Sequence, residues 1–153
     1  MRKPINIMIM GGNISSTMKN EGKESGFEDI PNYLEKTSKK PGLVFSKISM
    51  KDSRELKDDE RKLLLQEIKG SGAEHIVVTH GTITMRETAE FIKKKLLRDS
   101  RNKSKVIYFV GSEYYMDDNM TDALFNLGFI LGKVESMESG IYLYLNGATS
   151  CIQ

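Results

Sequence analysis

The stretch that decides the fold lies at residues 77–88 and reads Val77-Val78-Thr79-His80-Gly81-Thr82-Ile83-Thr84-Met85-Arg86-Glu87-Thr88. The apolar, β-branched run at 75–78 predicts a buried strand, and Gly81 ends it. A helix is expected to follow, because Thr84 and Glu87 have the spacing of a capping box. Thr82 is not needed for that cap. Its hydroxyl is expected where a strand gives way to a helix, which is the edge at which open α/β sheets bind small ligands.

Strand and helix patterns alternate along the rest of the chain. Short, mostly apolar runs predict buried parallel strands at 5–10, 43–50, 75–79, 106–110 and 141–145. Apolar residues at helical spacing predict helices at 29–36, 58–69, 85–97 and 122–134. With right-handed crossovers this order gives an α/β fold, a flavodoxin-like three-layer αβα sandwich with a mainly parallel five-stranded sheet of order 2-1-3-4-5. The 153 residues are expected to form a single domain, 1–153.

Four segments resemble motifs of the L-asparaginase family, the threonine amidohydrolases. Residues 79–88 resemble T-H-G-T-D-T-M-x-E-T, and residues 10–16 (M-G-G-N-I-S-S) resemble T-G-G-T-I-x-S. Residues 51–61 resemble D-S-x-x-[ML]-T-x-E-[DW], and residues 111–128 resemble G-[SA]-M followed by [ST]-D-A-x-x-N-L. The four segments keep the family's order over almost the whole chain. The resemblance implies a short, single-domain form of the N-terminal domain of a full-length asparaginase.

The resemblance also implies roles for individual residues. Asparaginases carry threonines at the ends of the first and third strands, and these positions fall on Asn13 and Thr82. A serine that contacts the ligand falls on Ser53, and an aspartate paired with the second threonine falls on Ile83. The catalytic positions are therefore Thr82 and Asn13, the latter a substituted nucleophile position. The substrate-binding positions are Gly12, Ser53, Gly81 and Ile83.

Three members of the catalytic unit depart from the family. The amide of Asn13 has no nucleophilic oxygen at neutral pH, and isoleucine at position 83 removes the carboxylate that would hold a substrate ammonium group. The family's lysine would lie in or beyond the segment after Asn146-Gly147, and residues 148–153 contain no lysine. Loss of one member of a catalytic unit commonly costs about 10⁴ to 10⁶ in rate. The sequence therefore predicts a pseudoenzyme candidate with a pocket for asparagine or a similar small amide or amino acid, in which L-asparagine hydrolysis is weakened or lost.

Other side chains are candidates to replace the missing groups. Ser15 or Ser16 could act as a shifted nucleophile, since two residues of extended chain reach at most roughly 7 Å. His80 has an ordinary pKa suited to a base, although packing or a hydrogen bond to the backbone is its simpler role. The polar segment 15–26 is either a connector or a lid over the ligand edge. Asparaginases have a flexible flap here with a tyrosine, which this segment lacks, and Phe27 offers no hydroxyl.

Composition limits the possible partners. A formal net charge of +2 with scattered lysines does not favour nucleic acid, and no apolar run approaches the length of a membrane span. One cysteine and two histidines exclude an internal disulfide and cannot build a metal site unaided. No cofactor is expected, because Gly11-Gly12 fits neither a G-x-G-x-x-G nor a Walker pattern. We expect a cytoplasmic protein that forms a homo-oligomer, a dimer, because a partner subunit helps to complete the site in full-length asparaginases.

Three functions compete at this point. The first is an asparaginase-type amidohydrolase with Thr82 as nucleophile. The second is a module of the same fold that binds a small ligand or a partner without turnover. The third is a flavodoxin-like nucleotide binder that shares only the topology. The four ordered motifs favour the first two functions, and the residue chemistry at positions 13 and 83 argues against fast hydrolysis.

Overall fold

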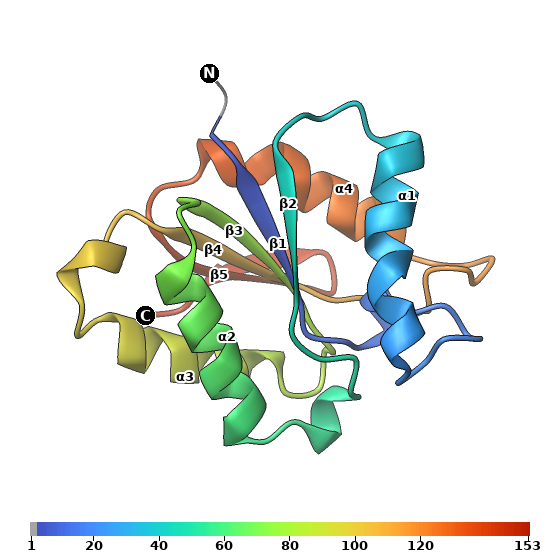
Figure 1. Cartoon of the computed structure of the whole chain (residues 1–153), viewed down its shortest axis with the longest axis horizontal. Coiled ribbons are helices and arrows are strands. Elements are labelled where there is room, and N and C mark those ends of the chain that lie inside the picture. Colours follow the sequence, from blue (N-terminus) through green and yellow to red (C-terminus); the bar gives the residue numbers. More distant parts are fainter. Residues whose placement is uncertain (1–2) are drawn as a thin grey trace.

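Strands and helices alternate along the chain in the computed structural model, which describes residues 3–153 (Figure 1). The strands are β1 Ile5–Ile9, β2 Leu43–Lys47, β3 His75–Thr79, β4 Val106–Val110, β5 Gly140–Leu145 and β6 Ala148–Cys151. The α-helices are α1 Asp29–Thr37, α2 Asp58–Gly70, α3 Met85–Leu96 and α4 Ala123–Lys133. Every predicted element is present. The largest change in bounds is in β2, which ends at Lys47 rather than at residue 50.

The sheet has the order β2-β1-β3-β4-β5-β6. Its first five strands are parallel in the predicted order. The prediction of five strands is wrong by one, because β6 pairs antiparallel with β5. Asn146 and Gly147 join these two strands with φ angles of 50° and 77°, and an Asn-Gly pair is the sequence signal for such a tight hairpin turn. The strand itself is polar and mostly exposed, so it lacks the apolar pattern on which the other strands were predicted.

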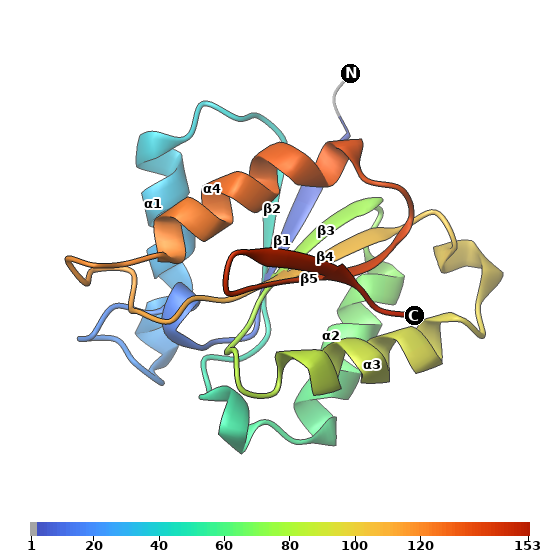
Figure 2. The same cartoon turned by 180° about the vertical axis from the view of Figure 1, so that it is seen from behind.

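Helices cover both faces of the sheet (Figures 1 and 2). On one face, α1 and α4 pack against side chains that include Ile7 and Val77. On the other face, α2 and α3 pack against side chains that include Met8 and Val78. Neighbouring residues of one strand thus enter opposite cores, because side chains alternate across a strand. The three-layer sandwich is confirmed. Within residues 3–153, no helix has both the length and the apolar character needed to cross a membrane.

The parallel register brings the ends of three strands to one edge of the sheet. Ile9 of β1 is paired with Thr79 of β3, and Thr79 is paired with Val110 of β4. All residues of β1 and β4 are buried, so the loops that follow these strands start from a packed base. Sequence segments 10–16, 80–84 and 111–122 therefore approach one another at this edge, as expected for a ligand site in an open α/β sheet.

Candidate functional site

Two glycines allow the loops at this edge to touch. Gly12, with a φ of 79°, has a backbone conformation that side chains rarely adopt. A Cβ atom on Gly12 would lie 2.5 Å from the Cα atom of Gly81, and a Cβ atom on Gly81 would lie 2.7 Å from the Cβ atom of Ser53. Both distances are far below van der Waals contact. The loops after β1 and β3 and the turn after β2 are thus in direct backbone contact.

Above these glycines lies a cavity of about 360 Å³. All six site residues predicted from the sequence line it: Gly12, Asn13, Ser53, Gly81, Thr82 and Ile83. Six further residues complete its wall: Glu21, Asp52, Arg54, Ser112, Glu113 and Tyr115. The volume is at the small end of the range for ligand pockets. The structure brings the predicted residues together, and the catalytic and binding roles given to them remain predictions.

The turn before α3 offers hydrogen-bond donors to this cavity. Within residues 3–153, the backbone N–H groups of Gly81, Thr82 and Ile83 have no hydrogen-bond partner, and neither does the hydroxyl of Thr82. The Thr82 side chain is exposed. Successive free N–H groups in a turn form a concave site for an anion or a carbonyl oxygen, and the start of the following helix adds positive potential. This arrangement suits a carboxylate or a carboxamide.

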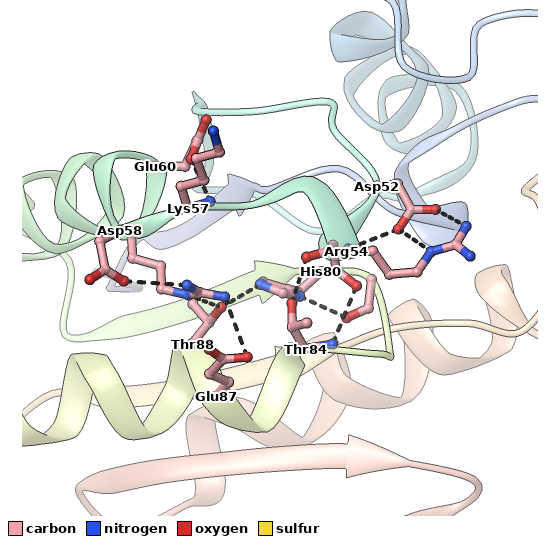
Figure 3. Close-up of polar contacts among 12 residues, drawn as sticks. Asp52, Arg54, Lys57, Asp58, Glu60, His80, Thr84, Glu87 and Thr88 are labelled. Atoms are coloured by element: carbon pink, nitrogen blue, oxygen red, sulfur yellow. Dashed lines mark hydrogen bonds and ion pairs between the residues drawn. The ribbon is translucent and has the colours of Figure 1, made fainter.

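Thr84 occupies the predicted N-cap position of α3, but its side chain does not cap the helix. Its Oγ1 donates a hydrogen bond to the carbonyl oxygen of Ser53 at 2.8 Å (Figure 3), and α3 has no side-chain cap hydrogen bond. The predicted capping box of Thr84 and Glu87 is therefore wrong. The backbone N–H of Thr84 donates to Ser53 Oγ at 3.3 Å. Since that contact uses Ser53 as an acceptor, the Ser53 hydroxyl proton remains available to a ligand.

Asn13 is held by the loop after β4. Its side-chain Nδ2 donates to the carbonyl oxygen of Glu113 at 2.7 Å, and the backbone N–H of Glu113 donates in turn to the carboxylate of Asp122. The amide at position 13 thus ties together the loops after β1 and β4. Asn13 thus has a structural role at the cavity wall. An amide can fill this role by hydrogen bonding, without any nucleophilic chemistry.

Three carboxylates and one guanidinium give the cavity a negative balance. Asp52 and Arg54 form a bidentate pair, with Nε and Nη2 of Arg54 at 3.0 and 2.7 Å from the carboxylate oxygens, and this pair lowers the pKa of Asp52 (Figure 3). Interaction with the nearby carboxylate of Glu21 raises the pKa of the Tyr115 hydroxyl to about 12. Within residues 3–153, the carboxylate of Glu113 has no partner. The unpaired negative charge favours a ligand that carries a cation.

A buried network lies beneath the same turn (Figure 3). His80 is 0% exposed, and its Nδ1 lies 2.7 Å from the Gly81 carbonyl oxygen. A carbonyl only accepts, so Nδ1 carries the proton. Nε2 of His80 lies 2.8 Å from Thr88 Oγ1, and Thr88 Oγ1 accepts from Arg61 Nε at 3.0 Å. The prediction that His80 packs and bonds to the backbone is confirmed.

This environment removes His80 from the candidates for a catalytic base. Burial lowers its pKa to about 4, and the nearby charge of Arg61 acts in the same direction. Both ring nitrogens are already hydrogen bonded inside the protein, and neither faces the cavity. Arg61 connects the network to the surface through ion pairs with Asp58 and Glu87, at 3.4 and 3.7 Å. The chain of contacts therefore joins α2, α3 and the Gly81 carbonyl.

The two serines considered as substitute nucleophiles point elsewhere. Ser15 is buried, with its Oγ 2.7 Å from Thr79 Oγ1. Ser16 is also buried, and its Oγ donates to the carbonyl oxygen of Gly12 at 3.0 Å. Neither residue lines the cavity. The hypothesis of a shifted nucleophile is wrong, because these hydroxyls hold the loop in place from inside.

The polar segment 15–26 is folded against its surroundings. Asn20 Nδ2 donates to the carboxylate of Asp29 at 3.2 Å, and the backbone N–H of Met18 donates to Asp117 at 3.0 Å. The segment places Glu21 on the cavity wall, and Tyr115 from a different loop supplies the phenol that the segment lacks. Sequence reasoning missed Glu21, Glu113 and Tyr115. The rule that parallel strands end at one edge was the signal for Glu113, which lies in the loop three residues after the end of β4.

The cavity lacks groups for metal binding and for general-base catalysis in the part of the chain that the structure describes. Within residues 3–153, no cluster of three His, Cys, Asp or Glu side chains is placed to hold a metal ion. No lysine lines the cavity. Ile83, at the position where the resemblance implies an aspartate, is 71% exposed. Thr82 is therefore a hydroxyl in a ligand-sized cavity without a base within hydrogen-bond distance.

Known proteins share the fold of this chain. The family model for the N-terminal domain of asparaginase matches residues 4–149. L-asparaginase I from Vibrio cholerae O1 biovar eltor has a TM-score of 0.78 and 21% sequence identity, over 97% of this chain and 45% of that one. The thermostable L-asparaginase from Thermococcus kodakarensis has a TM-score of 0.72 and 20% identity, over 93% of this chain and 44% of that one. The chain thus spans less than half the length of these two proteins. No curated protein matches the sequence.

Proposed function

Because this chain belongs to the family of asparaginase N-terminal domains, we propose that its cavity binds asparagine or a similar small amide or amino acid. We also propose that hydrolysis of the amide is weak or lost. One observation carries the proposal. Within residues 3–153, the Thr82 hydroxyl and three backbone N–H groups at 81–83 have no hydrogen-bond partner, and no group beside Thr82 is placed to take its proton.

The ligand class follows from the charges around the cavity. The free N–H groups before α3 suit a carboxylate or a carboxamide oxygen. The unpaired carboxylate of Glu113 suits an ammonium group at the opposite side of a small molecule. An amino acid with an amide side chain carries all three of these groups. A ligand without a cation would leave Glu113 uncompensated.

Weak hydrolysis follows from the nucleophile's surroundings. A threonine hydroxyl must lose its proton to attack a carboxamide, which requires a base at about 2.6 to 3.2 Å. Thr82 has no such neighbour within residues 3–153. Asn13 uses its amide to hold Glu113, and His80 is buried and neutral. The cavity therefore offers several groups that can bind a ligand, but within residues 3–153 it offers no base that could activate Thr82.

Calorimetric titration with asparagine, aspartate and glutamine, run beside an ammonia-release assay, tests the proposal. We expect at least one of the three to bind with ammonia release no faster than the blank. Succinamate, which is asparagine without its amino group, is the matched control ligand and is expected to bind about tenfold more weakly. Rapid ammonia release, or no binding by any of the three ligands, would contradict the proposal.

A further inference from the structure

A second cavity, of about 260 Å³, lies at the opposite edge of the sheet from the candidate site. It is built where β4 and β5 begin and where α3 ends. Figures 1 and 2 both show the carboxyl end of the chain close to α3 on this side of the molecule. We call it the basic cavity, because its lining includes Lys93, Lys103 and Lys105 and, within residues 3–153, no Asp or Glu side chain.

Lys105 is the most unusual of the three lysines. The residue is only 9% exposed, and its Nζ donates to the carbonyl oxygens of Ser71 and Ala73 at 2.9 and 3.0 Å. Burial lowers the pKa of Lys105, and the charge of Glu74 partly offsets this effect. Glu74 is itself paired with Lys3. Carbonyl groups fix the position of an ammonium group but do not neutralise it. An ammonium group also has three donors, and these carbonyls use two.

Lys93 is held in a similar way. Its Nζ donates to the carbonyl oxygen of Ile152, just after β6. Lysines in the last turn of a helix often only complement its dipole, and that explains Lys94 and Lys95 at the end of α3. It does not explain Lys103 and Lys105, which lie outside the helix and approach the same space from the loop before β4.

The floor of the basic cavity is apolar. Leu96, Ile107 and Ile141 are buried side chains that line it. Three lysines beside an apolar floor, with no Asp or Glu side chain in the lining within residues 3–153, match a molecule with an anionic end and an apolar body. We propose that the basic cavity binds a small organic carboxylate with an apolar body. This site is separate from the proposed amide site, and it stands whether or not that site binds asparagine.

Titration followed by two-dimensional NMR of the whole chain tests this proposal with benzoate as the probe. We expect saturable shifts of backbone amides near 102–107 and 139–141. Benzamide has nearly the same shape without the charge, and it should bind at least about tenfold more weakly. The proposal is overturned if benzamide binds as well as benzoate, if inorganic phosphate binds as tightly, if the shifts occur only at 81–83, or if no saturation is seen at about 10 mM, where a millimolar site would be mostly occupied.

Two lysine variants provide a matched comparison. Lys103→Gln removes an exposed charge whose ammonium group has no partner within residues 3–153, so folding should be unchanged. Benzoate should bind about 3- to 10-fold more weakly. Lys94→Gln removes the same charge from an exposed position outside the cavity, and its effect should be less than twofold. Equal effects of the two variants would show that only net charge matters, and the site would then be rejected.

Discussion

Beneath the turn that joins β3 to α3, the polar atoms of His80 and Thr88 are each hydrogen bonded to a partner inside the protein. Above the same turn, the hydroxyl of Thr82 and three backbone N–H groups have no partner within residues 3–153. The lower side is buried and the upper side faces a cavity. Only a few residues of chain separate the two.

This contrast separates the buried residues that position the turn from the groups above it that could contact a ligand. A saturated network fixes the backbone from below, because each buried polar group that lost its partner would carry a desolvation cost. Free donors above the fixed backbone keep their hydrogen-bonding capacity for a ligand. A preorganised cradle of this kind can bind without reacting. Reaction would also require a base beside the nucleophile, and within residues 3–153 no lysine or histidine lines the cavity beside Thr82.

The largest expected effect comes from breaking the lower side. Thr88→Val preserves shape but removes the hydroxyl that accepts from Arg61 and contacts His80. A buried guanidinium and a buried imidazole nitrogen would each lose a partner, so we expect the free energy of unfolding to fall by about 3 to 4 kcal/mol. Urea denaturation followed by circular dichroism measures this change.

The same substitution on the upper side is the control. Thr82→Val removes an exposed hydroxyl with no partner in the described chain, so stability should change by less than about 0.5 kcal/mol. A Thr88→Val effect as small as that of Thr82→Val would show that the network does not hold the turn.

The second-largest effect is expected from acid, which should destabilise the buried network around His80. The unfolded chain protonates a histidine near pH 6.5, whereas folded His80 has a pKa of about 4 because it is buried. The stability that His80 contributes is therefore fully present above pH 6.5 and is lost as the pH falls toward 4. Between pH 7 and 4.5 this loss should be about 2 to 3 kcal/mol.

Urea denaturation at several pH values, compared between the natural chain and His80→Gln, isolates this contribution. The variant has no titrating ring, so its stability should depend less steeply on pH over that range, whatever its absolute stability. A direct NMR titration of the imidazole gives the folded pKa. A value near 6.5, or identical pH slopes in both proteins, would contradict the buried neutral state.

The contrast also explains what the sequence could and could not predict. The strands at 75–79 and 106–110 were predicted to the residue, because buried parallel strands carry an unbroken apolar signal. Thr84 was expected to cap α3 and instead bonds to Ser53, a residue 31 positions away. Spacing along the chain describes local caps, but it does not reveal a competing partner that arrives through tertiary packing.

The site residues also fall into those that the sequence could indicate and those that it could not. Gly12, Ser53, Gly81 and Thr82 lie in the motifs that resemble asparaginases, and this resemblance gave them as residues of one site. Pattern and topology alone indicated only that Thr82 lies at the ligand edge of the sheet. Tyr115 reaches the cavity from a loop with no regular period, and its contact with Glu21 joins two irregular segments. Contacts between two loops have no periodic signature in a sequence. They could be found only once the sheet had fixed where both loops begin.

A smaller effect is expected when the upper side is changed. Thr82→Val should weaken binding of the preferred amino acid by roughly 1 kcal/mol, about fivefold, because one ligand hydrogen bond is lost. Thr82→Ser keeps the hydroxyl and should bind like the natural chain. Calorimetry on both variants measures the difference. Equal weakening by Val and Ser would assign the effect to the lost methyl contacts rather than to the hydroxyl.

The smallest effect should come from restoring the family's residues. Asn13→Thr combined with Ile83→Asp returns an alcohol and a carboxylate to the cavity, but it brings no lysine to the cavity lining and breaks the Asn13 contact with Glu113. Since general-base catalysis alone contributes about 10²- to 10⁴-fold, we expect ammonia release from asparagine to rise less than tenfold. Ligand binding by the double variant must be measured as a control, because a cavity that no longer binds asparagine would also release no ammonia. Fast turnover with binding intact would mean that positions 13 and 83 were the limiting changes, and that a proton acceptor reaches Thr82 once they are restored.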